Sequence, residues 1–186
     1  MMRHIEEHDL GTGHNITKIN KTCMSQLSNQ ALIGQIHTIK PDFIYIHLGV
    51  NDILQQNSPN HTIKHLQTFL NATSSLKSTK IIISQPLLTG YHHLNHAIST
   101  LRQNIITLIN YITTAYPNKK HRLYFNTNSN FYDKSTRSQQ DPSQFVNKNI
   151  DYVHLSTKGK KSILANMRYV IHHLTRTTPS QLINKH

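Results

Sequence analysis

The stretch that decides the fold is FIYIHLGVND, residues 43–52. Its first six residues are apolar or aromatic apart from one histidine, and they end at Gly49, which is typical of a strand buried in a parallel sheet. Asn51 and Asp52 follow almost at once. Because ligands of parallel α/β sheets bind outside the carboxyl ends of the strands, this polar turn is a candidate functional site.

Similar runs and helical patterns alternate along the rest of the chain. Further strands are predicted over residues 5–10, 80–86 and 122–126. Apolar residues at helical spacing predict helices over residues 20–39, around 63–70, over 92–115 and after Ser156, a plausible N-cap. Residues 127–149 are polar and indicate a long loop. This alternation predicts the α/β class, with helices around a mostly parallel sheet, in one domain over residues 1–176 followed by a short tail over 177–186.

Composition excludes several classes of protein. The 186 residues contain one cysteine, which excludes a disulfide framework and a thiolate-only zinc site. No apolar run approaches the roughly 18 residues of a membrane span, and no signal peptide is visible, so we expect a cytoplasmic protein. Lys and Arg number 20 against 8 Asp and Glu, and the net charge of +12 predicts attraction to polyanions such as nucleic acid.

No cofactor or metal is expected. Gly11-Thr12-Gly13 lacks the third glycine and the lysine of a phosphate-binding loop. His92 and His96 are four residues apart in a predicted helix, but no carboxylate lies nearby in the sequence to complete a metal site. We therefore interpret these histidines as solvated.

Two polar motifs have a catalytic interpretation. Asp151 precedes His154 by three residues, and a carboxylate so placed holds one imidazole nitrogen while the other faces a substrate. The side-chain amide of Asn51 is suited to a developing oxyanion, and Gly49 would allow the backbone to approach closely. Each motif alone is also an ordinary turn composition.

Taken together, G-x-N-D at residues 49–52 and D-x-x-H-L-S-x-x-G at residues 151–159 resemble the SGNH/GDSL hydrolase family. The resemblance implies a flavodoxin-like three-layer α/β/α sandwich that hydrolyses a small carboxylic ester through a serine nucleophile. It implies that His154 is the general base, that Asp151 orients it, and that Asn51 contributes to the oxyanion hole. The second glycine donor of that hole would be Gly13, with Gly11 as the alternative.

The family's nucleophile block, Gly-Asp-Ser after the first strand, has no counterpart ahead of residues 5–10. Ser25 and Ser28 fall inside a predicted helix, and so does Cys23, which we expect to be a buried structural thiol or a plain surface residue. The expectation is therefore an N-terminally truncated domain that lacks the first, central strand and is inactive. Three outcomes are open: a truncated gene product, a shift of residues 5–10 to pair with 43–48, or a strand supplied by a partner. We favour truncation, with a sheet that closes the gap.

An alternative from another functional class is a catalytically dead SGNH-like module that binds nucleic acid or another polyanion. The net charge favours it, although no basic cluster is interleaved with stacking aromatic residues. The sequence predicts no oligomeric state.

Overall fold

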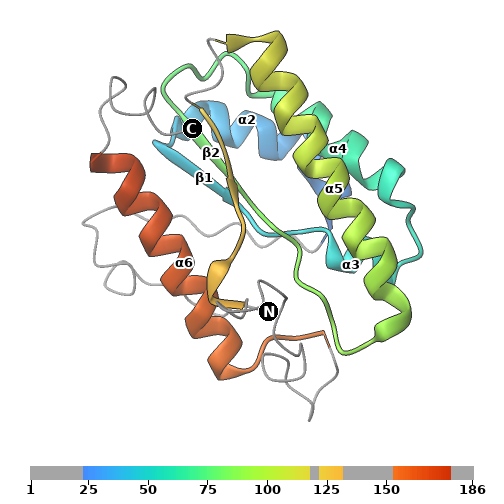
Figure 1. Cartoon of the computed structure of the whole chain (residues 1–186). Coiled ribbons are helices and arrows are strands. Elements are labelled where there is room, and N and C mark those ends of the chain that lie inside the picture. Colours follow the sequence, from blue (N-terminus) through green and yellow to red (C-terminus); the bar gives the residue numbers. More distant parts are fainter. Residues whose placement is uncertain (1–22, 118–121, 132–152, 177–186) are drawn as a thin grey trace. The chain divides into compact units, whose positions relative to one another are not determined.

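The computed structural model describes residues 23–117, 122–131 and 153–176 (Figure 1). These residues belong to two compact units, which divide between Phe125 and Asn126. The predictions for residues 5–10 and 177–186, and for most of the loop over 127–149, lie outside the described residues. The single domain over 1–176 stays a prediction.

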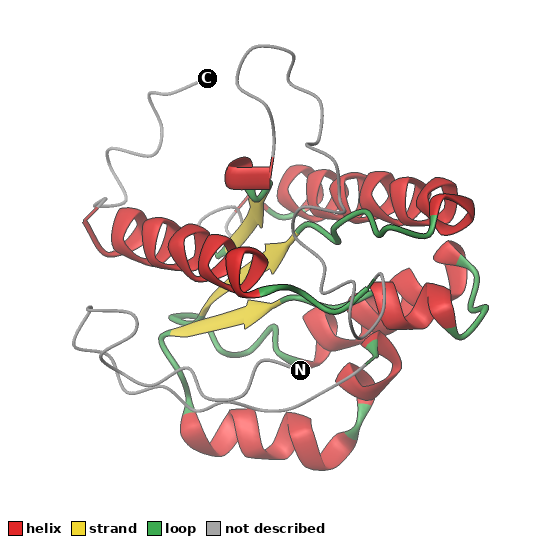
Figure 2. Cartoon of the chain, turned by 90° about the horizontal axis from the view of Figure 1, so that it is seen from below, coloured by secondary structure: helices red, strands yellow, loops and turns green. Residues whose placement is uncertain are grey.

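The first unit is built on a sheet of three strands in the order β1-β2-β3 (Figure 2). The strands are β1, Phe43–Ile46; β2, Lys80–Ser84; and β3, Leu123–Asn126. β1 and β2 are parallel, with Phe43 paired to Lys80 and Ile46 to Ile83. The α/β class is confirmed, and so are the strands predicted over residues 43–48, 80–86 and 122–126, although β1 and β2 each end two residues earlier than expected.

Helices connect the strands and supply most of the core. They are the 3₁₀ helix η1, Met24–Ser28, and the α-helices α2, Gln30–Ile39; α3, Val50–Leu54; α4, Pro59–Ala72; and α5, His92–Ala115. Figure 1 shows α4 and α5 side by side. Their inner faces carry fully buried side chains, namely Leu66, Phe69, Ile98, Leu101 and Ile105. Each such side chain stabilises the fold by about 1.5–3 kcal/mol relative to an exposed position.

The helix predicted over residues 20–39 is broken at Asn29 in the structure. The Asn29 backbone is extended, with φ −69° and ψ 124°, and its side chain accepts hydrogen bonds from the amides of Ala31 and Leu32. An N-cap residue of this kind begins a helix and cannot continue one. The prediction from apolar spacing is therefore correct for the part of the helix that forms α2. The residues before Asn29 form a separate element, η1.

The second unit contains η3, Ser129–Phe131, and α6, Thr157–Arg176. The predicted N-cap of the last helix is confirmed, because Ser156 Oγ accepts the Gly159 amide at 3.2 Å. Buried asparagines join its elements: Asn128 Oδ1 accepts from the side-chain amides of Asn126 at 3.2 Å and Asn166 at 3.4 Å. None of the helices in the described ranges is both long and apolar enough to cross a bilayer.

Candidate active site

The turn after β1 depends on Gly49. Its φ is +113°, and a Cβ there would lie 2.8 Å from Leu101 Cδ2 and 3.3 Å from Met24 Cε. Only glycine adopts this conformation without strain. The turn leads directly into α3, so Asn51 lies in the first turn of a short helix, where the sequence had indicated an irregular turn.

Asp52 anchors this turn in the unit. Its side chain is 1% exposed, and its Oδ2 accepts the Met24 backbone amide at 2.8 Å. Asn51 is only partly buried, and among the described residues its side-chain amide has no hydrogen-bond partner. The neighbouring residues thus have different roles: Asp52 fixes the helix, and Asn51 keeps a donor available.

The segment that begins η1 packs against α3, which the sequence did not indicate. Cys23 is 4% exposed and its Sγ donates to Gln55 Oε1 at 3.4 Å, so of the two alternatives for this residue the structure shows the buried thiol and not the surface residue. Met24 is 1% exposed and binds Asp52. No local pattern could have signalled contacts between segments about thirty residues apart.

A serine–histidine pair lies at the carboxyl ends of β1 and β2, and sequence reasoning missed it. His47 Nδ1 is 2.8 Å from Ser84 Oγ. Burial lowers the pKa of His47 to about 4, so its imidazole is neutral at pH 7. A neutral imidazole beside a hydroxyl is the arrangement of a nucleophile and its base. However, Ser84 is only 1% exposed, so an ester carbonyl cannot approach its Oγ, and the pair ties the two strand ends together.

The remaining predicted site residues are not brought together here. Asp151 and Gly13 lie outside the described residues. His154 is exposed and belongs to the second unit, whereas Asn51 belongs to the first. The grouping of Asp151, His154 and Asn51 around one substrate therefore stays a prediction.

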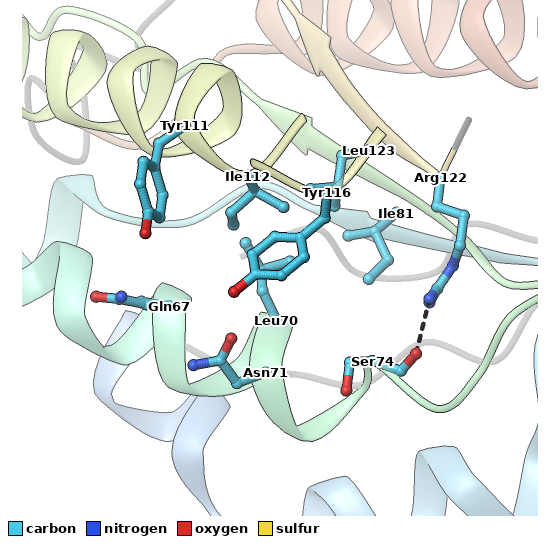
Figure 3. Close-up of a pocket in the computed structure, with 10 residues that line it drawn as sticks. All are labelled: Gln67, Leu70, Asn71, Ser74, Ile81, Tyr111, Ile112, Tyr116, Arg122 and Leu123. Carbon is cyan, nitrogen blue, oxygen red and sulfur yellow. Dashed lines mark hydrogen bonds between the residues drawn. The ribbon is translucent and has the colours of Figure 1, made fainter. Parts of the chain in front are cut away.

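One cavity of about 160 Å³ lies between α4 and α5 (Figure 3). It adjoins Ile81 and Leu123, which are at the amino ends of β2 and β3. Asn51 follows the carboxyl end of β1, at the other edge of the sheet. The cavity is smaller than the roughly 300–1,000 Å³ of most ligand sites and is set apart from the catalytic candidates.

A second hollow, of about 440 Å³, adjoins α3 itself. Ile53 and Leu54, two and three residues after Asn51, line it together with Tyr91, His93 and Leu94. Its volume falls within the usual range for small-molecule sites. Of the two cavities, this one is lined by residues of the helix that carries Asn51. Among the described residues, no group of three or more His, Cys, Asp or Glu side chains could hold a metal ion.

A Gly-x-Asn-Asp turn at the carboxyl end of a parallel strand, in an α/β fold, is the arrangement of an SGNH-type hydrolase. The family model for GDSL-like lipases and acylhydrolases matches residues 16–167, so the chain belongs to this family. The predicted family is thereby confirmed. No curated protein matches the chain.

Solved structures are similar in fold. A carbohydrate esterase family 3 protein from Talaromyces cellulolyticus is 17% identical, with a TM-score of 0.64 over 84% of this chain and 70% of that one. An acetyl esterase variant with an acetate ion gives the same four values. A G-D-S-L family protein from Desulfitobacterium hafniense is 15% identical, with a TM-score of 0.57 over 87% of this chain and 86% of that one. At these identities the likeness concerns the fold.

Proposed function

We propose that this chain carries the carbonyl-binding part of a carboxylic-ester site. Asn51 supplies the oxyanion donor with Gly13, and His154, oriented by Asp151, is the base. The observation that carries the proposal is the Asn51 amide, which is unpartnered among the described residues and follows the carboxyl end of β1. The buried Asp52 beside it holds the turn rigid, and a preorganised donor is what a developing oxyanion requires.

The hollow beside α3 is proposed to hold the acyl or alcohol group of a small ester. It begins two residues beyond Asn51 and its lining includes Ile53, Leu54 and Leu94. Apolar lining with a few polar groups is typical of pockets for small organic ligands.

The nucleophile is the missing component, and we propose that these 186 residues bind esters without forming an acyl-enzyme. They contain no Gly-Asp-Ser sequence. Ser84 is buried, and Ser28, whose Oγ donates to the Ser25 carbonyl at 2.9 Å, lies at the end of η1 and does not follow a strand.

Carbonyl binding is tested by titrating the ¹⁵N-labelled chain with acetate, an oxyanion mimic, and following the Asn side-chain amides by NMR. We expect a saturable shift of the Asn51 amide and weaker acetate binding in Asn51→Ala. Asn110→Ala, an exposed asparagine on α5, is the matched control and should bind as the parent does. Equal affinity of the two variants would refute the assignment of Asn51.

The absence of a nucleophile is tested with a fluorophosphonate probe and intact-mass spectrometry, alongside hydrolysis of 4-nitrophenyl acetate. We expect no covalent adduct and no burst of nitrophenol. Any slow hydrolysis should fall in His154→Gln and not in His172→Gln, an exposed histidine on α6. Stoichiometric phosphonylation of one serine would show that the chain is a complete esterase.

A second candidate function, binding of single-stranded RNA, is favoured by the charge of α6. This helix has no acidic residue, and several basic side chains on it are exposed, namely Lys158, Lys160, Lys161, Arg168 and Arg176. Phosphate contacts release counterions, so affinity should fall steeply with salt and weaken when Lys160 and Lys161 are both changed to Glu. Lys64→Glu on α4 is the control. A flat dependence on salt would rule this function out.

A further inference from the structure

Two histidines of α4, His61 and His65, converge at the surface of the first unit. They are one helical turn apart, and their rings are 5.0 Å apart at an angle of 86°. The turn that carries His61 is well fixed, because Ser58 Oγ accepts the His61 amide at 3.1 Å and Pro59 is the first helical residue. His61 is exposed and His65 is partly buried, so the pair is accessible to solutes.

A chain of polar contacts runs from the Ser25 carbonyl through Ser28 to His65. Ser28 Oγ is 2.9 Å from the Ser25 carbonyl oxygen, which can only accept, so the single hydroxyl proton is donated there. Ser28 Oγ is also 3.2 Å from His65 Nδ1, and while its own hydrogen is on the Ser25 carbonyl it accepts in that contact. In this arrangement neutral His65 carries its hydrogen on Nδ1, which leaves the lone pair on Nε2.

That lone pair faces the second imidazole. His65 Nε2 and His61 Nε2 are 3.4 Å apart, beyond the roughly 2.7–3.2 Å of ordinary N–H hydrogen bonds to oxygen. Two nitrogens bound at about 2.0–2.1 Å to one tetrahedral zinc ion lie about 3.3–3.4 Å apart. The spacing thus matches chelation of a single ion.

We propose that His61 and His65 form a bidentate site for a divalent transition-metal ion of the zinc class. Ser28 is the outer-shell partner that orients His65, as the second nitrogen of a metal-bound histidine is usually hydrogen-bonded. Because no third His, Cys, Asp or Glu joins the pair among the described residues, water completes the coordination. The site is independent of the ester site proposed above.

The chain contains its own control for this proposal. His92 and His96 have the same four-residue spacing on α5, but in the described structure their rings make no contact with each other. If spacing alone caused metal binding, both pairs would bind. If the Ser28-oriented geometry matters, only His61 and His65 will.

The test is calorimetric titration of the whole chain with Zn²⁺, with glycine as a weak competitor to suppress diffuse binding by the other histidines. We expect a tightest phase of one ion per chain. His61→Ala and His65→Ala should each weaken it by at least about tenfold, and Ser28→Ala by about tenfold, the lower end for an outer-shell partner. His92→Ala should change it less than about twofold. Circular dichroism verifies that each variant keeps its helices.

Two results would overturn the proposal. One is an affinity of His61→Ala equal to that of His92→Ala, and the other is the lack of a one-ion phase in the parent chain. The relative affinities for different metal ions give a further check. A pair of imidazoles should bind Cu²⁺ more tightly than Zn²⁺ and should not bind Mg²⁺. Equal binding of Mg²⁺ and Zn²⁺ would indicate carboxylate or non-specific binding and would also refute it.

Discussion

Gly49 occupies the residue position at which β1 turns into α3, and its backbone determines where Asn51 lies. The positive φ and the nearby Leu101 and Met24 side chains leave no room for a Cβ. The family's Gly-x-Asn-Asp motif therefore has a steric reason at its first position. Its last position, Asp52, is equally structural, because the buried carboxylate satisfies the Met24 amide.

Gly49→Ala should lower the free energy of unfolding by about 1–3 kcal/mol, because it forces a strained backbone and a close contact with Leu101. Urea unfolding followed by circular dichroism measures this change. The control is Gly34→Ala in α2, where a Cβ would meet nothing within 4 Å and where alanine should stabilise by about 0.5–1 kcal/mol. Similar effects at both positions would contradict the structure of the turn.

His47 predicts a dependence of stability on pH. Burial lowers its pKa in the folded chain from 6.5 to about 4, so between these values the unfolded chain binds more protons. Stability should therefore be lost as the pH falls from about 6.5 towards 4, by at most about 3 kcal/mol from this group. In unfolding experiments across this range, His47→Gln should show a shallower pH slope than the parent, and His172→Gln should not. An unchanged slope in His47→Gln would contradict the buried neutral imidazole.

At the scale of elements, Arg122 joins the end of α4 to the start of β2 and β3. Its guanidinium donates to the carbonyls of Thr73 at 3.2 Å, Ser74 at 3.0 Å and Thr79 at 3.1 Å, and Figure 3 shows it at the edge of the small cavity. Burial lowers the pKa of Arg122, which nonetheless stays charged. The planar fork reaches three acceptors that a single ammonium cannot match.

Arg122→Lys should lower the free energy of unfolding by about 1–3 kcal/mol, since at least one carbonyl loses its charged donor. Thermal unfolding would detect the loss. Arg168→Lys, at an exposed position on α6, should stay within about 0.5 kcal/mol of the parent. If both variants unfold at the same temperature, Arg122 does not hold these elements together.

The helices show which elements could be predicted from the sequence and which could not. The helix predicted over residues 92–115 is confirmed as α5, and its apolar stripe lies in the core, with Ile98, Leu101 and Ile105 fully buried. The break at Asn29 and the helix α3 were missed, because a cap and a five-residue helix are too short to produce a periodic pattern. The basic outer face of α6 could be read from its residue types alone.

For the whole molecule, the net charge of +12 on 186 residues causes long-range electrostatic repulsion. Charges of one sign repel each other more strongly in the compact state than in the unfolded chain. Raising the ionic strength from about 0.01 M to about 0.15 M shortens the Debye length from about 30 Å to about 8 Å. The melting temperature should therefore rise with salt.

Scanning calorimetry in two salt concentrations tests this prediction. A variant with Lys64→Glu and Lys160→Glu has a lower net charge and should respond less to salt than the parent. A parent melting temperature that is unchanged or falls with salt would show that local ion pairs outweigh the overall repulsion.

The sequence by itself determined the α/β class, the central strands and the family, because apolar period, turn residues and the Gly-x-Asn-Asp and Asp-x-x-His motifs are local properties. Asn51 follows the first of these strands in the sequence, and in the structure it lies in the first turn of α3. The missing first strand, the catalytic roles of Asp151, His154 and Gly13, and the absence of turnover stay predictions.

Only the tertiary structure decided which polar groups meet. The contacts of Met24 with Asp52, of His47 with Ser84 and of Ser28 with His65 join residues 28, 37 and 37 positions apart. No periodic pattern encodes such pairs, since they form when packed helices and strands bring distant segments within hydrogen-bond distance. The structural role of Asp52, the pair of Ser84 and His47 and the proposed metal site all depend on that packing.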